Sequence, residues 1–225
     1  MIFAMIGTMA ATMAWFDGRA ALRVGGEPPP AGQVERTPEG YRCGACRITT
    51  PLPEGYPGPT APGAIEIKRY PSVRRAEVTR SGSVDWGMNG AFWPLFRHIQ
   101  RRDIEMTSPV EMDYPGMLDD RDARPSGWTM SFLYRTADLG PTGSDGKSVV
   151  VVDTEPLTVV AAGFRGSYSM SVVRTNMEML EQWLADQSEW ERAGEARALH
   201  YNGPEQRARD RWGEVQIPVR RRSAE

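Results

Sequence analysis

The chain has 225 residues, of which 40% are hydrophobic and 25% are charged. These proportions are those of an ordinary folded protein, and the length suits one globular domain with extra terminal sequence, or two small ones. The formal charge of −2 and the pI near 5.8 give no electrostatic reason to expect a nucleic-acid partner, so we interpret the basic run Arg220–Arg222 as a solvated tail.

The first sixteen residues, Met1–Phe16, carry no charged side chain. This run is somewhat shorter than the roughly 20 residues of a typical membrane span. It also lacks the basic residues that precede the apolar part of a secretory signal. Three interpretations remain: a membrane anchor, an atypical or truncated signal, or a buried or partner-facing helix. We favour an anchor within residues 1–24, which predicts a membrane-anchored or cell-envelope location over a cytoplasmic one.

Residues 25–63 are rich in proline and glycine, which predicts a linker or an arm that follows the surface. The two cysteines of the chain, Cys43 and Cys46, lie within it. A structural zinc site needs four ligands, and covalent haem attachment needs a histidine where Arg47 stands. We therefore expect either inert thiols or a local disulfide.

The stretch from Met88 to Glu111 reads as a helix followed by a strand. One helical face is apolar, and its members recur at steps of three and four: Met88, Ala91, Phe92, Leu95, Phe96 and Ile99. Since Pro94 fits best in a first turn, the helix is expected to begin near residues 91–93. From Ile104 the apolar period becomes two, which predicts a strand, and Pro109 places that strand at an edge or a bulge.

The sequence from 64 to 220 also shows an internal repeat, with copies at 64–136 and 148–220. Strand-like residues precede Pro71 and Pro156, which are 85 positions apart, and a second apolar helix is expected over about 171–190. Each copy reads strand, helix, strand, strand, which predicts an α+β domain with its helices on one side.

No sequence-local triad, phosphate loop or paired-metal motif is present. Glu105 and Glu111 lie in the alternate register of the predicted strand. They either belong to a solvated strand face or point into a pocket, where desolvation would raise the carboxyl pKa and favour acid–base chemistry.

Four separated motifs resemble the SOUL haem-binding family: IEIKRY at 65–70, LFRHIQ at 95–100, IEMTSPV at 104–110 and WGEVQIPV at 212–219. The resemblance covers about Ala64 to Val219. It implies a distorted antiparallel β-barrel flanked by two helices, and it implies non-covalent binding of haem or a related porphyrin. Some members are described with a haem-binding histidine in the first-strand motif, where this chain has Arg69.

Haem binding requires an apolar surface for the porphyrin, cations for its propionates and, in some proteins, an axial ligand. The first helix offers all three, with His98 as the candidate axial ligand. We therefore predict a site on this helix formed by Met88, Ala91, Leu95, Arg97, His98, Arg101 and Arg102.

Three functional hypotheses follow. The first is a non-enzymatic tetrapyrrole-binding protein. The second is an enzyme that acts on a small hydrophobic or tetrapyrrole substrate in a cleft between the repeats, with Glu105 or Glu111 as the essential carboxylate. The third is an envelope-tethered scaffold without ligand or activity.

Overall fold

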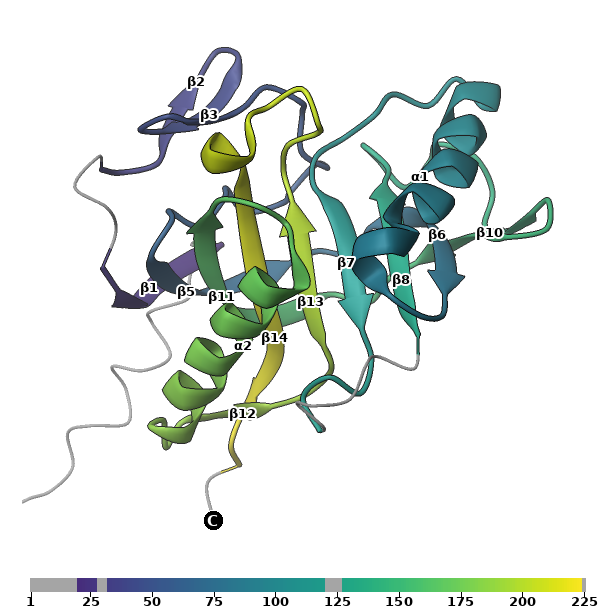
Figure 1. Cartoon of the computed structure of the whole chain (residues 1–225). Coiled ribbons are helices and arrows are strands. Elements are labelled where there is room, and N and C mark those ends of the chain that lie inside the picture. The colour runs from purple at the N-terminus through teal and green to yellow at the C-terminus, as the bar shows by residue number, and fades with distance from the viewer. Residues whose placement is uncertain (1–19, 28–31, 120–126, 224–225) are drawn as a thin grey trace, which may run out of the picture.

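The structure, a computed structural model, describes residues 20–27, 32–119 and 127–223. It is an α+β fold with a long antiparallel sheet and two helices (Figure 1). The elements are β1 Ala21–Gly26, β2 Glu35–Thr37, β3 Gly40–Cys43, β4 Cys46–Ile48, β5 Ala64–Tyr70, β6 Arg74–Arg80, α1 Val84–Arg101, β7 Val110–Tyr114, β8 Trp128–Leu133, β9 Gly143–Asp145, β10 Val149–Asp153, β11 Leu157–Arg165, α2 Met170–Ala185, β12 Trp190–Arg192, β13 Ala196–His200 and β14 Trp212–Arg221, with a 3₁₀ turn at Ala208–Asp210.

The main sheet runs in the order β1-β5-β11-β14-β13-β7-β8-β6-β10-β9, with β12 beside β14. No pairing between described strands joins β1 to β9, so the expected closed barrel is wrong and the sheet is open. The predicted unit had one strand before its helix. In the structure two strands precede each helix, and the additional strands are β6 before α1 and β11 before α2. The part of the sheet from β5 to β10 has a symmetric strand order. When β5, β6, β7 and β8 are matched with β10, β11, β13 and β14, each strand and its match lie at equal distances from the two ends of this part, and β13 and β7 pair at its centre. The tandem repeat itself stays a prediction.

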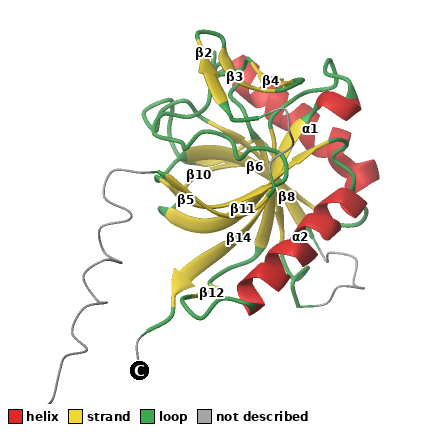
Figure 2. Cartoon of the chain, turned by 90° about the vertical axis from the view of Figure 1, so that its left-hand side faces the viewer, coloured by secondary structure: helices red, strands yellow, loops and turns green. Residues whose placement is uncertain are grey.

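Both helices cover the same side of the sheet (Figure 2). Helix α1 lies on β6, β8 and β10, and α2 lies on β11, β12 and β14. Their apolar faces pack into one core, in which Ala91 and Leu95 of α1 and Leu180 of α2 are fully buried. The burial of these faces is the main contribution of the helices to stability.

Helix α1 begins at Val84, about two turns before the predicted start, and Pro94 lies inside it. Pro94 has no N–H to donate to the carbonyl of Gly90 four residues earlier. The guanidinium of Arg80 donates to that carbonyl instead, at 3.1 Å. This external donor satisfies an acceptor that proline leaves open, so the helix continues through the proline.

The predicted strand over residues 104–111 is wrong over most of its length, because β7 begins only at Val110. Asp103 adopts a positive φ of 53° as the chain leaves α1. Between Asp103 and β7 the chain is fixed by side chains: Thr107 donates to the carbonyl of Leu133 at 2.5 Å and Ser108 to that of Tyr201 at 2.9 Å.

Residues 25–63 were predicted as a linker or arm. Residues 25 and 26 belong to β1, and residues 32–63, which we call the arm, are folded against the face of the sheet opposite the helices. Strands β2, β3 and β4 form a small sheet of their own, and Cys43 and Cys46 face each other across its second hairpin as buried free thiols. The following residues approach β11 closely, and a Cβ on Gly163 would lie 2.3 Å from the carbonyl oxygen of Ala61. Glycine at this position therefore permits the contact.

Most of the proposed membrane anchor, residues 1–19 of 1–24, lies outside the described residues, and its last residues, from Ala21, belong to strand β1. Within the described residues, neither helix combines the length and the apolar character that a bilayer span requires.

Candidate functional site

The apolar face of α1, predicted to receive the porphyrin, points into the protein. Ala91 and Leu95 have no exposed surface, and Met88 packs against the same core. The cationic residues Arg97 and Arg101 lie on the opposite, exposed side of the helix. The structure therefore does not bring the predicted apolar and cationic residues together on one accessible surface.

His98 is fully buried, and both of its ring nitrogens have partners. Nδ1 contacts a carboxylate oxygen of Asp145, and Nε2 lies 2.6 Å from the hydroxyl of Tyr134. Asp145 also receives Arg101 at 3.0 Å and Arg102 at 3.4 Å. The hydrogen bond from His98 lowers the pKa of Asp145 to about 2, and the bonds from the two arginines act in the same direction. His98 thus ties the β9–β10 hairpin to α1, and this arrangement offers iron no free nitrogen.

The two glutamates of the enzymatic alternative are far from equivalent. Glu105 is exposed. Glu111 is fully buried on β7, where Arg197 contacts one carboxylate oxygen at 2.6 Å and Arg75 the other at 3.0 Å. Two cations hold this carboxylate, so its position is that of an ion-paired structural group.

A second buried ion pair lies nearby, on the same face of the sheet. Lys68 and Glu214 have no exposed side-chain surface and are 2.8 Å apart. Burial works to raise the pKa of Glu214, but the charge of Lys68 and the hydrogen bonds to the carboxylate lower it overall. Tyr201 donates to the same carboxylate at 2.7 Å, and so does the backbone N–H of Thr60. Through Glu214, these bonds connect the arm to β14 and, by way of Lys68, to β5.

A cavity of about 360 Å³ opens on this face, between the first half of the domain (β5 to β8) and the second half (β10 to β14). Its charged lining includes Arg75, Asp113 and Arg197, and the rings of Tyr56 and Tyr70 meet edge to face within it. Arg75 pairs with Asp113 at 3.0 Å and Arg197 with Glu111 at 2.6 Å. Glu155 and Glu195 also line the cavity, so its charges are mixed and do not favour one class of ligand.

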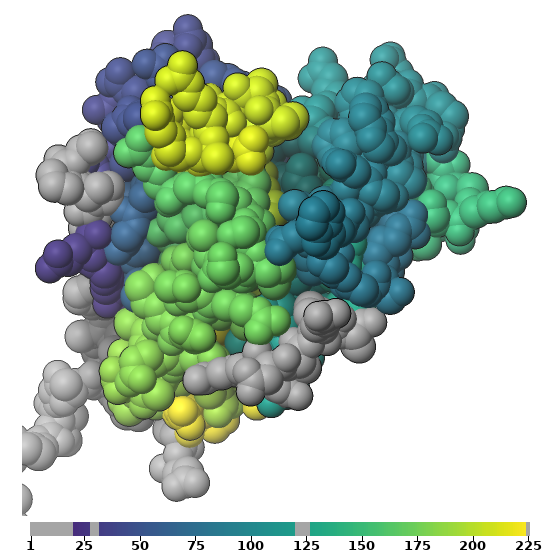
Figure 3. All heavy atoms as spheres, viewed as in Figure 1, coloured from purple at the N-terminus to yellow at the C-terminus, as the bar shows by residue number. Residues whose placement is uncertain are grey.

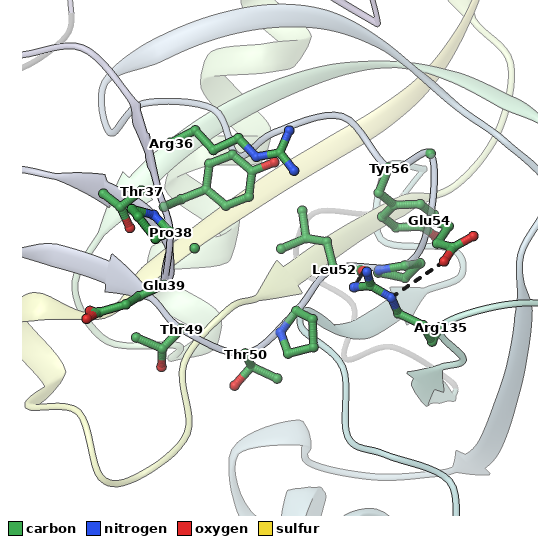
Figure 4. A pocket seen from close by; sticks show the side chains of 15 residues that line it. Arg36, Thr37, Pro38, Glu39, Thr49, Thr50, Leu52, Glu54, Tyr56 and Arg135 are labelled. Carbon is green, nitrogen blue, oxygen red and sulfur yellow. Dashed lines mark hydrogen bonds and ion pairs between the residues drawn. The ribbon is translucent and has the colours of Figure 1, made fainter.

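A separate hollow of about 600 Å³ belongs to the arm (Figure 4). Its lining comes from residues 36–56, with the single addition of Arg135, whose guanidinium donates to the carbonyl of Leu52 at 2.7 Å. Arg36 and Arg135 are accompanied there by Glu39 and Glu54, and the polar lining is mixed.

On the helix side, a hollow of about 290 Å³ lies between α1 and the loop that follows β13; we call it the α1 groove. In Figure 3 a hollow separates the teal atoms of the first half from the green and yellow atoms of the second. The lining residues of the α1 groove are Thr50, Phe92, Phe96, Met106, Thr107, Ser108, Val110, His200, Tyr201, Asn202, Gly203, Pro204 and Glu205.

One wall of the α1 groove is aromatic. The rings of Phe92 and Phe96 are nearly parallel, with centroids 5.7 Å apart, and Trp93 meets both of them edge to face. Trp93 is 52% exposed, so the aromatic surface continues from the groove to the outside of α1. Flat apolar molecules stack favourably on such a surface.

The opposite wall contains His200, the last residue of β13. Its imidazole is buried, and its Nε2 has no hydrogen-bond partner within the described part of the chain. Burial lowers the pKa of His200 to about 3, and the charge of Arg211 acts in the same direction. The ring is therefore neutral at neutral pH, which is the form of histidine that binds metals.

The signal for this wall in the amino-acid sequence is weak. His200 follows Ala196 and Ala198 in the alternate register of β13, which predicts a buried side chain. His200 pairs with Val110 of β7 and shares the groove lining with Phe92 and Phe96 of α1, and contacts between such distant segments have no local signature. Phe92 and Phe96 were recognised as apolar helix residues but not as the groove wall.

Residues 59–218 match the family model described as "SOUL heme-binding protein". This match confirms the resemblance drawn from the four motifs. A comparison with curated proteins finds no match.

Several solved structures share the fold at low sequence identity. The C-terminal domain of EcmrR is 14% identical with a TM-score of 0.52, and the match covers 69% of this chain and 96% of that domain. An EcmrR–DNA complex gives a TM-score of 0.55 at 14% identity, over 69% of this chain and 56% of that one. An uncharacterised conserved protein from Listeria innocua is 15% identical with a TM-score of 0.50, over 68% and 92% of the two chains. At these identities the likeness concerns the fold alone.

Proposed function

The chain belongs to the SOUL heme-binding protein family, and on that premise we propose that it binds haem or a related tetrapyrrole, without chemical turnover, in the α1 groove. The observation that carries the proposal is that one hollow is lined both by the rings of Phe92 and Phe96 and by His200, whose buried Nε2 has no hydrogen-bond partner within the described residues. The proposal keeps the predicted helix but moves the site from its inward face to its edge.

The shape and polarity of the α1 groove support a flat apolar ligand. A volume of about 290 Å³ is at the small end of ligand pockets, so the groove would enclose only part of a macrocycle. The exposed ring of Trp93 extends the apolar surface beyond it. Apolar area removed from water on these rings would supply most of the binding free energy.

The imidazole of His200 is a suitable axial ligand for an iron porphyrin. Haem iron takes axial ligands such as histidine, and His200 would offer the neutral imidazole that coordination requires. A buried nitrogen without a partner costs free energy in the apo protein, and a metal–ligand bond would recover it. His98, the earlier candidate, remains an alternative only if its contacts with Asp145 and Tyr134 can be given up.

Propionate groups need cations at the mouth of the site. Arg97 is exposed on α1 and forms no ion pair within the described residues, whereas Arg101 and Arg102 both contact Asp145. We therefore assign the propionate-binding role to Arg97 first.

The enzymatic alternative rests on the cavity of about 360 Å³ between the two halves. Glu105 is exposed, and Glu111 is held by two arginines, so neither carboxylate is in a state suited to a general base. We infer that Glu111 stabilises the fold, and tetrapyrrole binding in the α1 groove is the better-supported function.

The test is an absorption titration of the full chain with haemin. We expect a saturable shift of the Soret band, and we expect Phe96→Ser in the groove wall to weaken it at least tenfold. Val150→Ser, at another exposed apolar position on β10, is the matched control and should titrate like the wild type. Absence of a saturable spectral change in the wild type would remove the proposal.

A further inference from the structure

The outer side of α1 carries an unusual stripe of residues. Trp86 is 90% exposed and Trp93 is 52% exposed. They are seven residues apart, so they project from the same side of the helix, about 10 Å apart along its axis. Arg97 and Arg101 continue that side toward the end of the helix.

Cations flank the two tryptophans. Arg80 reaches over from β6 and donates to Gly90, which lies on the same side of the helix between the tryptophans. We define the α1 stripe as Trp86, Trp93, Arg80, Arg97 and Arg101.

Carboxylates near the α1 stripe compensate only part of this charge. Asp145 contacts both Arg101 and Arg102. Asp85 lies in the first turn and accepts from the N–H of Met170, and Asp103 follows the end of the helix. Between Asp85 and Asp103 the helix has no acidic residue. Arg97 forms no ion pair within the described part of the protein.

We propose that the α1 stripe docks on the surface of a bilayer that contains anionic lipids. Tryptophan has an apolar ring with a polar N–H and concentrates at the level of the lipid headgroups. Arginine side chains beside it are attracted to anionic headgroups. A second copy of the chain is a poorer occupant, because a two-fold contact would pair the stripe with itself and bring like charges together.

The location of the α1 stripe gives docking a consequence for the groove. Trp93 belongs to the stripe and also contacts Phe92 and Phe96 of the groove wall. A bilayer bound to the stripe would lie beside the mouth of the α1 groove. Trp86 has no part in the groove lining, so substitutions there separate lipid docking from tetrapyrrole binding.

The test uses the full chain with Trp15→Phe, which removes the tryptophan of the N-terminal apolar segment as a reporter. Vesicles of phosphatidylcholine and phosphatidylglycerol with brominated acyl chains should quench part of the tryptophan fluorescence of the Trp15→Phe protein. The further changes Trp86→Phe and Trp93→Phe should abolish this quenching, because the remaining tryptophans lie inside the fold or away from the stripe. Arg97→Glu should weaken binding to these vesicles at least about fivefold.

Met179→Ser, at an exposed apolar position on α2, is the control and should bind vesicles like its parent. Trp86→Ser should reduce vesicle binding while leaving the haemin titration unchanged. Absence of quenching in the Trp15→Phe protein would overturn the proposal. A loss of self-association in Trp86→Ser, with vesicle binding unchanged, would assign the stripe to a second copy instead.

Discussion

The imidazole of His200 stacks on the ring of Tyr168, with centroids 4.0 Å apart and planes inclined by 1°. Tyr168 precedes α2, and its hydroxyl donates to the carbonyl of Trp212 at 2.6 Å and accepts from the N–H of Asn202 at 2.9 Å. These bonds fix the tyrosine to both ends of the loop that forms one wall of the α1 groove. The position of the imidazole is therefore set by the fold before any ligand arrives.

Stability should depend on the protonation of His200. The unfolded chain binds a proton on this side chain below about pH 6.5, whereas the folded protein does so only near pH 3. The contribution of His200 to the unfolding free energy is fully present above its pKa in the unfolded chain. It is lost as the pH falls from that value towards the lower pKa of the folded protein. We expect His200→Phe, which keeps an aromatic ring against Tyr168, to remove this component.

Urea unfolding without haemin, at pH values from about 7 down to about 4, measures the effect. The wild type should lose up to about 1.4 kcal/mol per pH unit more than His200→Phe over this range. Carboxylates such as Glu214 titrate in both proteins and cancel in the comparison. Parallel pH profiles would show that His200 is not buried as a neutral ring.

The Lys68–Glu214 pair should show strong coupling. Lys68→Met leaves the Glu214 carboxylate buried without its cation, and this should cost about 3–5 kcal/mol of unfolding free energy. Glu214→Gln removes the charge but keeps an acceptor for Tyr201 and Thr60. The double variant should be less destabilised than the sum of the two single variants, as measured by urea unfolding. Strict additivity would mean that the two charges contribute independently.

His98 should act on stability rather than on ligand binding. His98→Ala removes the partner of the buried Tyr134 hydroxyl and one of the contacts that hold Asp145 against α1, which should lower the unfolding free energy by about 1–3 kcal/mol. Asp145→Asn keeps the size of the side chain and should give a smaller loss. Thermal unfolding measures both variants. Unchanged stability of His98→Ala together with lost haemin binding would return the axial role to His98.

The fold could be predicted from the sequence where apolar period and family motifs agree. The amphipathic pattern through Ala91, Leu95 and Ile99 correctly predicted a helix, but its apolar face, assigned from the sequence to the porphyrin, packs into the core. The start of that helix was misplaced because Pro94 is normally a first-turn residue, and the compensating donor, Arg80, lies in a different element. A hydrogen bond between distant segments has no signature in a local pattern.

The site was harder to predict, for a related reason. Sequence spacing shows that Arg97 and His98 are neighbours in the chain, but it does not show that one is exposed and the other bonded on both nitrogens. Lys68 and Glu214 were not singled out from the sequence, because charged residues within strands usually belong to a solvated face. The folded arm covers that face and buries them as an ion pair, and its proline-rich composition gave no indication that it would.

The central claim, that a tetrapyrrole binds in the α1 groove with His200 as its axial ligand, is tested most directly by comparing haemin with iron-free protoporphyrin on His200→Ala and His98→Ala. The account predicts that His200→Ala binds haemin at least tenfold more weakly but binds protoporphyrin nearly as well as the wild type, and that His98→Ala binds both ligands like the wild type. Haemin binding and a Soret band unchanged in His200→Ala would contradict it.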